Sequence, residues 1–249
     1  MNKESIKTIL SRVKEKDLSV EDATTLLCGC SYKDIGCAKI DFQRKDRTGH
    51  PEVIFCQGKS TSQIERIIAA MLENESNILA TRVEQEVYDS LKEKFPTARY
   101  NRMAKTLCIT LSEPETTESY IAIVTAGTSD LPVAEEAMET ATMLGSRVEL
   151  IADVGVAGIH RLFDNMDIIN GARVVVVVAG MEGALASIVG GLVSVPVVAV
   201  PTSVGYGTHL GGITTLFAML TSCSDGIAAV NIDNGYGAGY YAHMINSMK

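Results

Sequence analysis

The sequence predicts an α/β protein with two parts: a small α+β domain over residues 1–117 and a parallel-sheet α/β domain over residues 118–249. The second part alternates short apolar runs with helix-length segments, which is typical of a parallel sheet covered by helices on both faces. Between the parts, residues 113–118 (EPETTE) are acidic and polar and include a proline, as in a linker. A chain of 249 residues is long enough for one large domain or two modest ones.

Composition excludes several classes of protein. The hydrophobic content of 46% provides a buried core, so the chain as a whole is not intrinsically disordered. The net charge of −8 argues against a nucleic acid as the main partner, because phosphate binding needs a basic surface. The run from Val174 to Val200 is long and apolar, but Glu182, Pro196 and several glycines interrupt it. We therefore expect a strand, a turn, a helix and a strand there rather than a membrane span, and, with no secretory signal evident, a cytoplasmic protein.

Helical spacing and short apolar runs give the expected elements of the first part. Apolar residues recur at helical spacing from Ile6 to Val13, and Ser19 is a candidate N-cap for a second helix. From the remaining patterns we expect strands at 35–42 and 52–55, a helix at 62–72, a strand at 77–81, a helix at 84–95, and a strand or hairpin at 98–111.

Three basic residues of the first part are candidate anion ligands. Arg44 and Arg47 lie in a turn-rich segment between the first two strands, where they either bind an anion or are solvated turn residues. Lys59 lies in Gly-Lys-Ser-Thr, directly before a helix. This tetrad does not complete a P-loop, because Val53 stands where that pattern needs its first glycine. Either Lys59 and the free helix amides hold an anion, or the hydroxyls that follow Lys59 only cap the helix.

The second part repeats a strand followed by a helix. We expect strands at 120–124, 147–152, 172–179, 196–200 and 227–231, and helices at 131–144, 155–165, 183–193, 211–220 and 237–248. Parallel strands joined by right-handed helical crossovers have their carboxyl ends at the same edge of the sheet. In open α/β sheets, ligands bind at that edge.

Three glycine-bearing turns are expected to converge there on one ligand: Ala126–Asp130, Ala179–Gly183 and Asp233–Gly237. None of them follows the GxGxxG pattern of a dinucleotide-binding fold. The first turn either only caps the following helix or holds a phosphate on its free amides. Asp153, after the second strand, is either an N-cap or a ribose ligand. Glu182 is the one charged residue of its turn, and so a candidate for chemistry.

Cys223 lies in a polar segment between the fourth expected helix and the last strand. It is either an ordinary thiol at a helix end or an accessible thiolate nucleophile. The cysteines at 28, 37, 56 and 108 are interpreted as small buried hydrophobic residues. His160 and Arg161 are interpreted as structural or surface residues of the second helix.

Four motifs of the second part resemble the LarB family, in this order along the chain: Ala126–Ala137 (AGTSDLPVAEEA), Ala152–Gly158 (ADVGVAG), Ala179–Ala186 (AGMEGALA) and Asn231–Gly239 (NIDNGYGAG). The segment 39–55, with Gly-Lys at 58–59 after it, extends the resemblance over nearly the whole chain. The second part of LarB is related to PurE, so the resemblance implies a PurE-like (flavodoxin- or Rossmann-like) domain. PurE-type proteins have a catalytic His in Ala-His-Arg after the second strand. This sequence has Ala-Asp-Val there, which favours LarB over the mutase.

The resemblance to LarB implies a substrate and a chemistry. LarB-type enzymes make pyridinium-3,5-biscarboxylic acid mononucleotide for the nickel-pincer cofactor. They carboxylate the ring of nicotinic acid adenine dinucleotide at C5 with CO2 and release AMP. By this resemblance the catalytic residues are Cys223, Glu182 and Ser129. Cys223 is the nucleophile, Glu182 transfers a proton or shapes the CO2 site, and Ser129, with Asp130, lies near the nicotinate mononucleotide half. The expected substrate-binding residues are Gly127, Thr128, Asp130, Asp153, Gly155, Gly180, Met181, Gly183, Asp233, Asn234, Gly235, Arg44, Arg47 and Lys59.

The resemblance also implies Mg²⁺ and assembly. Mg²⁺ often binds mainly through phosphates and water, so its protein ligands are left open. PurE-related sheets assemble as octamers, and we expect a homo-octamer. Two alternatives remain: a PurE-type carboxyaminoimidazole ribonucleotide mutase, and a non-catalytic nucleotide-binding module, which a buried and unreactive Cys223 would favour.

Overall fold

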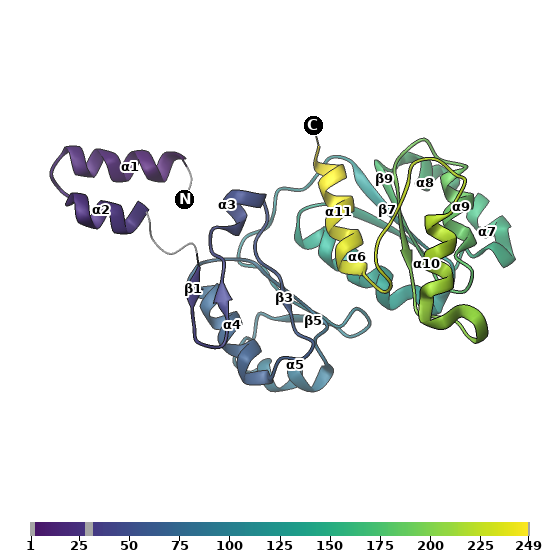
Figure 1. The fold of residues 1–249 in the computed structure, drawn as a ribbon, viewed down its shortest axis with the longest axis horizontal. Coiled ribbons are helices and arrows are strands. Elements are labelled where there is room, and N and C mark those ends of the chain that lie inside the picture. Colours follow the sequence, from purple (N-terminus) through teal and green to yellow (C-terminus); the bar gives the residue numbers. More distant parts are fainter. Residues whose placement is uncertain (1–2, 28–31, 249) are drawn as a thin grey trace.

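The computed structural model describes residues 3–27 and 32–248 and has its larger sheet in the second part of the chain (Figure 1). The strands of this sheet are all parallel: β7 (Tyr120–Thr125), β8 (Arg147–Ile151), β9 (Val174–Ala179), β10 (Val197–Pro201) and β11 (Ile227–Ala229). Their order is β8-β7-β9-β10-β11. This is the flavodoxin-like arrangement, in which the chain changes direction between β7 and β9 and leaves a crevice for a ligand there. The predicted fold class is confirmed.

β9 lies at the centre of the sheet, and its valines alternate between two cores. Val175 and Val177 pack in the core formed with α7 (Ile159–Phe163), α8 (Met166–Gly171), α9 (Ala184–Gly190) and α10 (Ile213–Leu220). Val174 and Val176 pack in the core formed with α6 (Leu131–Met143) and α11 (Gly235–Ser247). All four valines are fully buried, as expected for the central strand of a sheet covered on both faces.

Two helices of the second part begin later than predicted. The expected helix 155–165 is a 3₁₀ turn, η2 (Val156–Gly158), followed by α7, because Gly158 has a non-helical backbone (φ −132°, ψ 53°). The unpredicted helix α8 comes next. The expected helix 211–220 begins at Ile213, because Leu210 and Gly211 adopt left-handed conformations within η3 (Gly207–Gly212).

The first part has a smaller mixed sheet of β3 (Ile54–Phe55), β4 (Ile78–Thr81), β6 (Thr106–Ile109) and β5 (Arg99–Asn101), in that order. Helices α4 (Thr61–Glu73) and α5 (Gln85–Leu91) accompany it, as predicted. Of the two possibilities left open for 98–111, a strand or a hairpin, the structure has the hairpin, formed by β5 and β6. The single strand expected at 35–42 is instead the short hairpin β1 (Lys33–Asp34) and β2 (Lys39–Ile40).

The remaining helices of the first part are short. The amide of Asp22 donates to the hydroxyl of Ser19 (2.9 Å), which confirms Ser19 as a cap before α2 (Val20–Leu27). Helix α1 (Lys3–Lys14) packs against α2 (Figure 1). The basic segment expected as a turn forms the one-turn helix α3 (Arg44–Thr48), which ends at Gly49 in a left-handed conformation.

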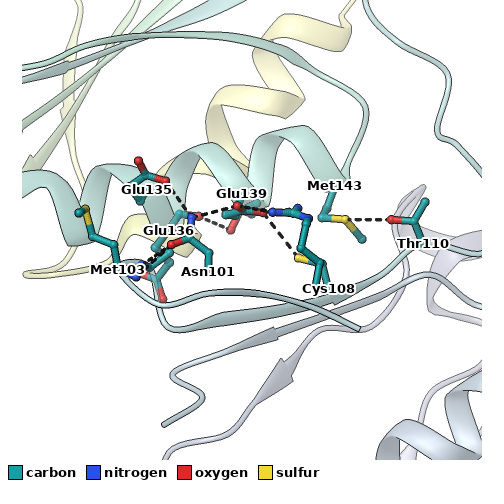
Figure 2. A network of polar contacts seen from close by, with 11 residues as sticks. Asn101, Met103, Cys108, Thr110, Glu135, Glu136, Glu139 and Met143 are labelled. Carbon is teal, nitrogen blue, oxygen red and sulfur yellow. Dashed lines mark hydrogen bonds and ion pairs between the residues drawn. The ribbon is translucent and has the colours of Figure 1, made fainter. Parts of the chain in front are cut away.

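Helix α6 contacts both parts of the chain. One face packs on the parallel sheet and α11. On the other side, Glu135 and Glu139 contact Asn101 of β5, and Glu139 also contacts Cys108 of β6 (Figure 2). The Arg99 guanidinium donates two hydrogen bonds to Glu139 (2.7 and 2.6 Å). Burial raises the pKa of Glu139, but Arg99 and Asn101 outweigh burial, so its pKa is lowered. Charge pairing thus fixes the first part of the chain on α6. The domain boundary at 117/118 stays a prediction.

Candidate active site at the carboxyl edge of the sheet

Asp130 joins the turns that follow β7 and β10. It ends the 3₁₀ turn η1 (Thr128–Asp130), which leads into α6. Its carboxylate accepts hydrogen bonds from the amide of Gly127 (3.0 Å) and from the hydroxyl of Thr202 (2.7 Å), the residue after β10. Burial raises the pKa of Asp130, and these hydrogen bonds oppose the rise. Asp130 therefore holds the edge of the site in shape.

A cavity of about 450 Å³ opens where the turns meet, and we name it the sheet-edge cavity. It lies at the carboxyl ends of β7 and β9, where the strand order changes direction. Many of the predicted site residues line it together: Gly127, Ser129, Asp130, Asp153, Gly155, Gly180, Met181, Glu182 and Gly183. The predicted Thr128 lies in η1 and is exposed.

Two glycines let the walls of this cavity come into backbone contact. A Cβ on Gly155 would lie 2.5 Å from the carbonyl oxygen of Ala126, and a Cβ on Gly180 would collide with the carbonyl oxygen of Val204. A side chain at either place would push two turns apart. The glycines of these motifs therefore shape the cavity as well as leaving room for a ligand.

Asp153 forms an ion pair with Arg161, and both side chains line the sheet-edge cavity. Asp153 does not cap the following turn, whose N-cap is Gly155. The expectation that Arg161 is only a structural or surface residue missed its place on the cavity. In the structure Gly158 makes room for the guanidinium, because a Cβ there would lie 2.7 Å from Nε of Arg161, a contact that the sequence pattern does not show.

Glu182 lies on an exposed turn at the mouth of the cavity. Met181 before it has a left-handed backbone (φ 49°), and its amide donates to the carbonyl of Val204 (2.9 Å). The hydroxyl of Thr215 in α10 donates to the carbonyl of Met181. The turn is therefore fixed from two sides, which leaves the carboxylate of Glu182 accessible at a defined place.

The third predicted turn does not reach the sheet-edge cavity: Asp233 lines a different cavity, and Asn234 and Gly235 line neither. Asn234 caps α11 by accepting a hydrogen bond from the amide of Gly237 (2.8 Å), and Gly235 packs against the carbonyl of Val133. Asp233 lines a cavity of about 440 Å³ between the two parts of the chain, which we name the interdomain cavity. Ser129 and Val204 line this cavity and the sheet-edge cavity, so the two are adjacent.

Arg82 connects the first part of the chain to this turn. Its guanidinium donates to both carboxylate oxygens of Glu136 (3.0 and 3.2 Å) and to the carbonyl of Asp233. Glu136 in turn accepts from the amide of Tyr236 (3.2 Å), at the start of α11. Burial raises the pKa of Glu136, and Arg82 opposes the rise without cancelling it. No sequence motif marks Arg82, which follows β4 directly.

The structure does not bring the three predicted basic residues to either cavity. Arg47 pairs with Asp41, and Lys59 donates to the carbonyl of Phe55 (2.6 Å). Ser60 forms a capping box with Gln63 at the start of α4, so the capping interpretation of this segment holds. Arg44 lies near α11. Burial raises the pKa of Tyr236 in that helix, and the charge of Arg44 opposes this rise.

Cys223 is exposed and lines neither cavity. It follows α10 and precedes β11, so it lies toward the amino edge of the sheet. Its neighbours are held to α9: the hydroxyls of Ser222 and Ser187 are 2.8 Å apart, and the hydroxyl of Ser224 donates to the carbonyl of Ser187 (2.6 Å). Within one chain, the structure therefore does not bring Cys223 to Glu182. A buried Cys223 would have favoured a non-catalytic nucleotide-binding module, and the side chain is exposed.

The other cysteines that the structure describes are less accessible. Cys37 is half-buried, while Cys56 and Cys108 are buried, as predicted. Burial raises the pKa of Cys56 to about 12, although Lys59 opposes the rise. Burial and the charge of Glu139 raise the pKa of Cys108 to about 12. Neither of these two thiols is a nucleophile at neutral pH, because the thiolate is the reactive form. Cys28 lies outside the described residues.

Among residues 3–27 and 32–248, no group of three or more His, Cys, Asp or Glu side chains is arranged to hold a metal ion. The described chain therefore has no cage of its own for the Mg²⁺ that the LarB resemblance implies. In the same ranges, no helix has the length and apolar character needed to cross a membrane.

Comparison with known proteins assigns both parts of the chain. Residues 32–112 match the LarB/PurE-like N-terminal domain, and residues 120–249 match the AIR carboxylase family. An uncharacterized protein of Methanocaldococcus jannaschii, MJ0165, is 40% identical over 250 residues, which cover 97% of this chain and 96% of that protein. The chain therefore belongs to the AIR carboxylase (PurE) family and has the LarB-like architecture, that of a carboxylase-type enzyme.

Proposed function

We propose that this protein carboxylates the pyridinium ring of nicotinic acid adenine dinucleotide at C5 with CO2 and hydrolyses the phosphoanhydride. The products are pyridinium-3,5-biscarboxylic acid mononucleotide and AMP, as in the first step of nickel-pincer cofactor synthesis. The observation that carries the proposal is the convergence of Ser129, Asp153 and Glu182 on one cavity in a chain of LarB-like architecture.

The chemistry needs a nucleophile, because a pyridinium carbon does not attack CO2. The thiolate of Cys223 adds to C4, and the ring becomes a dihydropyridine whose C5 has enamine character. C5 then forms a bond to the carbon of CO2. A base removes the C5 proton, and the returning electron pair expels the thiolate and restores the aromatic ring. Glu182, an accessible carboxylate at the cavity mouth, is the proposed acceptor of that proton.

Hydrolysis follows from the same bound substrate. Water adds to one phosphorus of the anhydride and the bond from that phosphorus to the bridging oxygen breaks, so that AMP and the mononucleotide separate and protons are released to solvent. Mg²⁺ would neutralise phosphate charge in this step. The described residues offer it no cage, so the phosphates and water would hold the ion.

The reaction requires Cys223 and Glu182 at one ring, and we infer that they come from two copies of the chain. Cys223 is exposed and lies outside the sheet-edge cavity of its own chain. The neighbouring helix α10 buries Thr215 and Met219, while Ile213, Phe217 and Leu220 are exposed, the last two to 61%. These three residues follow helical spacing and form an apolar face, as at an interface between subunits. PurE-like proteins typically oligomerise, and a homo-octamer is our proposal for this chain.

The direct test incubates the protein with nicotinic acid adenine dinucleotide, bicarbonate and Mg²⁺ and identifies the products by mass spectrometry. We expect AMP and a pyridinium mononucleotide that carries one added CO2. Cys223→Ala should abolish carboxylation, whereas the matched Cys37→Ala variant should retain it. Carboxylation by Cys223→Ala at the wild-type rate would exclude the covalent step, and the absence of both products from the wild type would refute the proposal.

Mixing two inactive variants tests the shared site. Cys223→Ala and Glu182→Gln each remove one partner, so homogeneous assemblies of either should be inactive. Subunits that co-assemble at random in equal amounts should recover about a quarter of the wild-type activity, because about one site in four then holds both native residues. Activity that stays absent in assemblies confirmed as mixed by mass spectrometry would place Cys223 and Glu182 in the same subunit.

A further inference from the structure

We propose that the interdomain cavity binds the second nucleotide of the dinucleotide, the nucleoside monophosphate that leaves as AMP. The proposal rests on the function proposed above and assigns one half of its substrate to residues of both parts of the chain. The two cavities measure about 440 and 450 Å³, each within the range of small-molecule sites, and both are lined by Ser129 and Val204. Two such cavities with a common border match two nucleotides joined by a phosphoanhydride.

The border between the cavities suits the phosphoanhydride. Ser129 is exposed and lies in η1, immediately before the 13-residue helix α6. The first amides of a helix lack partners within it, and its dipole favours negative charge at that end. A dinucleotide that occupies both cavities passes this point with its phosphates, so the hydroxyl of Ser129 and nearby amides are placed to contact them.

The walls of the interdomain cavity carry cations that are already held in place. Arg82 is fixed by Glu136, and the Lys105 ammonium contacts the two carboxylate oxygens of Glu84 at 2.9 and 2.8 Å. All four side chains line the cavity. Because their carboxylate partners limit their motion, the two cations lose little freedom when a phosphate binds.

The other lining groups suit a nucleoside. The amide of Gln57 and the carboxylate of Asp233 can hydrogen-bond to a base edge and to ribose hydroxyls, respectively. Met103 is 48% exposed and offers an apolar, polarizable surface to a base. The cavity thus presents two cations paired with carboxylates, polar groups and an apolar side chain together.

Backbone strain is concentrated on these walls. Arg82 (φ 57°), Lys105 (φ 52°) and Asp233 (φ 54°) all have left-handed backbones, which residues with a Cβ rarely adopt. Such conformations cost free energy and cluster at ligand-binding positions. Three of them around one cavity support a role in binding.

The test measures binding of AMP to the full-length protein by calorimetry, with nicotinate mononucleotide as the second probe. Lys105→Ala removes an exposed cation, and Met103→Trp fills the cavity. In both variants we expect the Kd for AMP to rise at least about tenfold, the effect of losing one good contact, while the Kd for nicotinate mononucleotide stays unchanged. Lys92→Ala is the matched control, because Lys92 is also an exposed lysine paired with a carboxylate, that of Asp89.

The outcomes separate this proposal from the proposed function. AMP that binds both variants as tightly as the wild type, or that fails to bind the wild type at millimolar concentration, overturns the assignment of this cavity even if carboxylation is observed. AMP binding that weakens in both variants, in a protein that makes no carboxylated product, retains the cavity and refutes the reaction.

Discussion

The sheet-edge cavity and the interdomain cavity share a border, but different elements of the chain line them. Turns of a single sheet form the first, with glycines in backbone contact, the ion pair of Asp153 and Arg161 on its wall and Glu182 at its mouth. Paired charges from both parts of the chain form the second. A ring that a thiolate and CO2 must both approach needs open space with few groups, whereas a nucleotide needs fixed cations. Because the cavities rest on different contacts, each can be disturbed while the other is kept.

The largest expected effect is on the chemistry of the sheet-edge cavity. Glu182→Gln removes the proposed proton acceptor and should lower the rate of carboxylation at least about a hundredfold, the usual contribution of a general base. The Kd for AMP should not change, since Glu182 does not line the interdomain cavity. Rapid-quench product analysis with calorimetry checks both, and Glu149→Gln, an exposed glutamate of β8, is the control. Weakened AMP binding in Glu182→Gln would contradict the separation of the cavities.

A second prediction concerns the walls of the sheet-edge cavity. Gly155→Ala places a Cβ 2.5 Å from the carbonyl of Ala126. We expect a loss of about 1–3 kcal/mol in the free energy of unfolding, measured in urea, because overpacking forces the backbone to move. At Gly191 the nearest atoms to an added Cβ are 3.6 Å away. Gly191→Ala should therefore be close to neutral, and equal losses in the two variants would argue against backbone contact as the cause.

A third prediction addresses the interdomain cavity. Arg82→Ala leaves the buried carboxylate of Glu136 without its cation, and we expect a loss of about 2 kcal/mol, less than for a fully buried pair because Arg82 is partly exposed. The exposed pair of Lys105 and Glu84 should contribute below about 1 kcal/mol, so Lys105→Ala is a mild control. In the double variant Arg82→Ala/Glu136→Gln part of the loss should be recovered. Strict additivity would show that the two side chains are not coupled.

The smallest expected effect is on the pH dependence of stability, and it comes from a contact between the two parts of the chain that lies away from both cavities. His243 of α11 is buried, accepts or donates a hydrogen bond with Ser146 (2.9 Å), and packs edge-on against His50. Burial, helped by the charge of His50, lowers the pKa of His243 from 6.5 to about 4. As pH falls below 6.5, His243 becomes protonated in the unfolded chain but stays neutral in the folded chain. The free energy of unfolding therefore decreases as the pH falls.

This loss should reach about 1 kcal/mol between pH 7 and pH 5.5. Urea titrations at several pH values measure it. His243→Gln should flatten the profile, whereas His160→Gln, at an exposed histidine, should not. An unchanged profile in His243→Gln would assign the pH dependence to other groups.

Much of the fold could be predicted because its signals are local. The five-valine run of β9 is buried on both faces, and the glycine turns after β7 and β9 lie where parallel topology requires them. Arg82 could not be found in this way, since its partner Glu136 is 54 residues further along the chain. The expected helix 155–165 was wrong at its start because Gly158 interrupts it, a backbone effect that apolar spacing does not report.

The position of Cys223 in the fold could not be predicted from the sequence either, for a different reason. Residue type and a polar setting correctly indicated an exposed thiol. They did not indicate that strand direction places it away from the Glu182 turn, which depends on where α10 ends and β11 begins. An interface between copies of the chain leaves no periodic pattern beyond an exposed apolar face such as that of α10.

The left-handed residues around the two cavities have a consequence for engineering. In addition to the three on the interdomain cavity, Asp153 (φ 59°) and Met181 (φ 49°) line the sheet-edge cavity. Replacing any of them with glycine relieves a strain of about 1 kcal/mol or more, yet it also frees the backbone that positions the side chain. Selection for heat resistance alone would favour such replacements and erode the site, so a stabilised form of this protein is better sought on the outer surface of its helices.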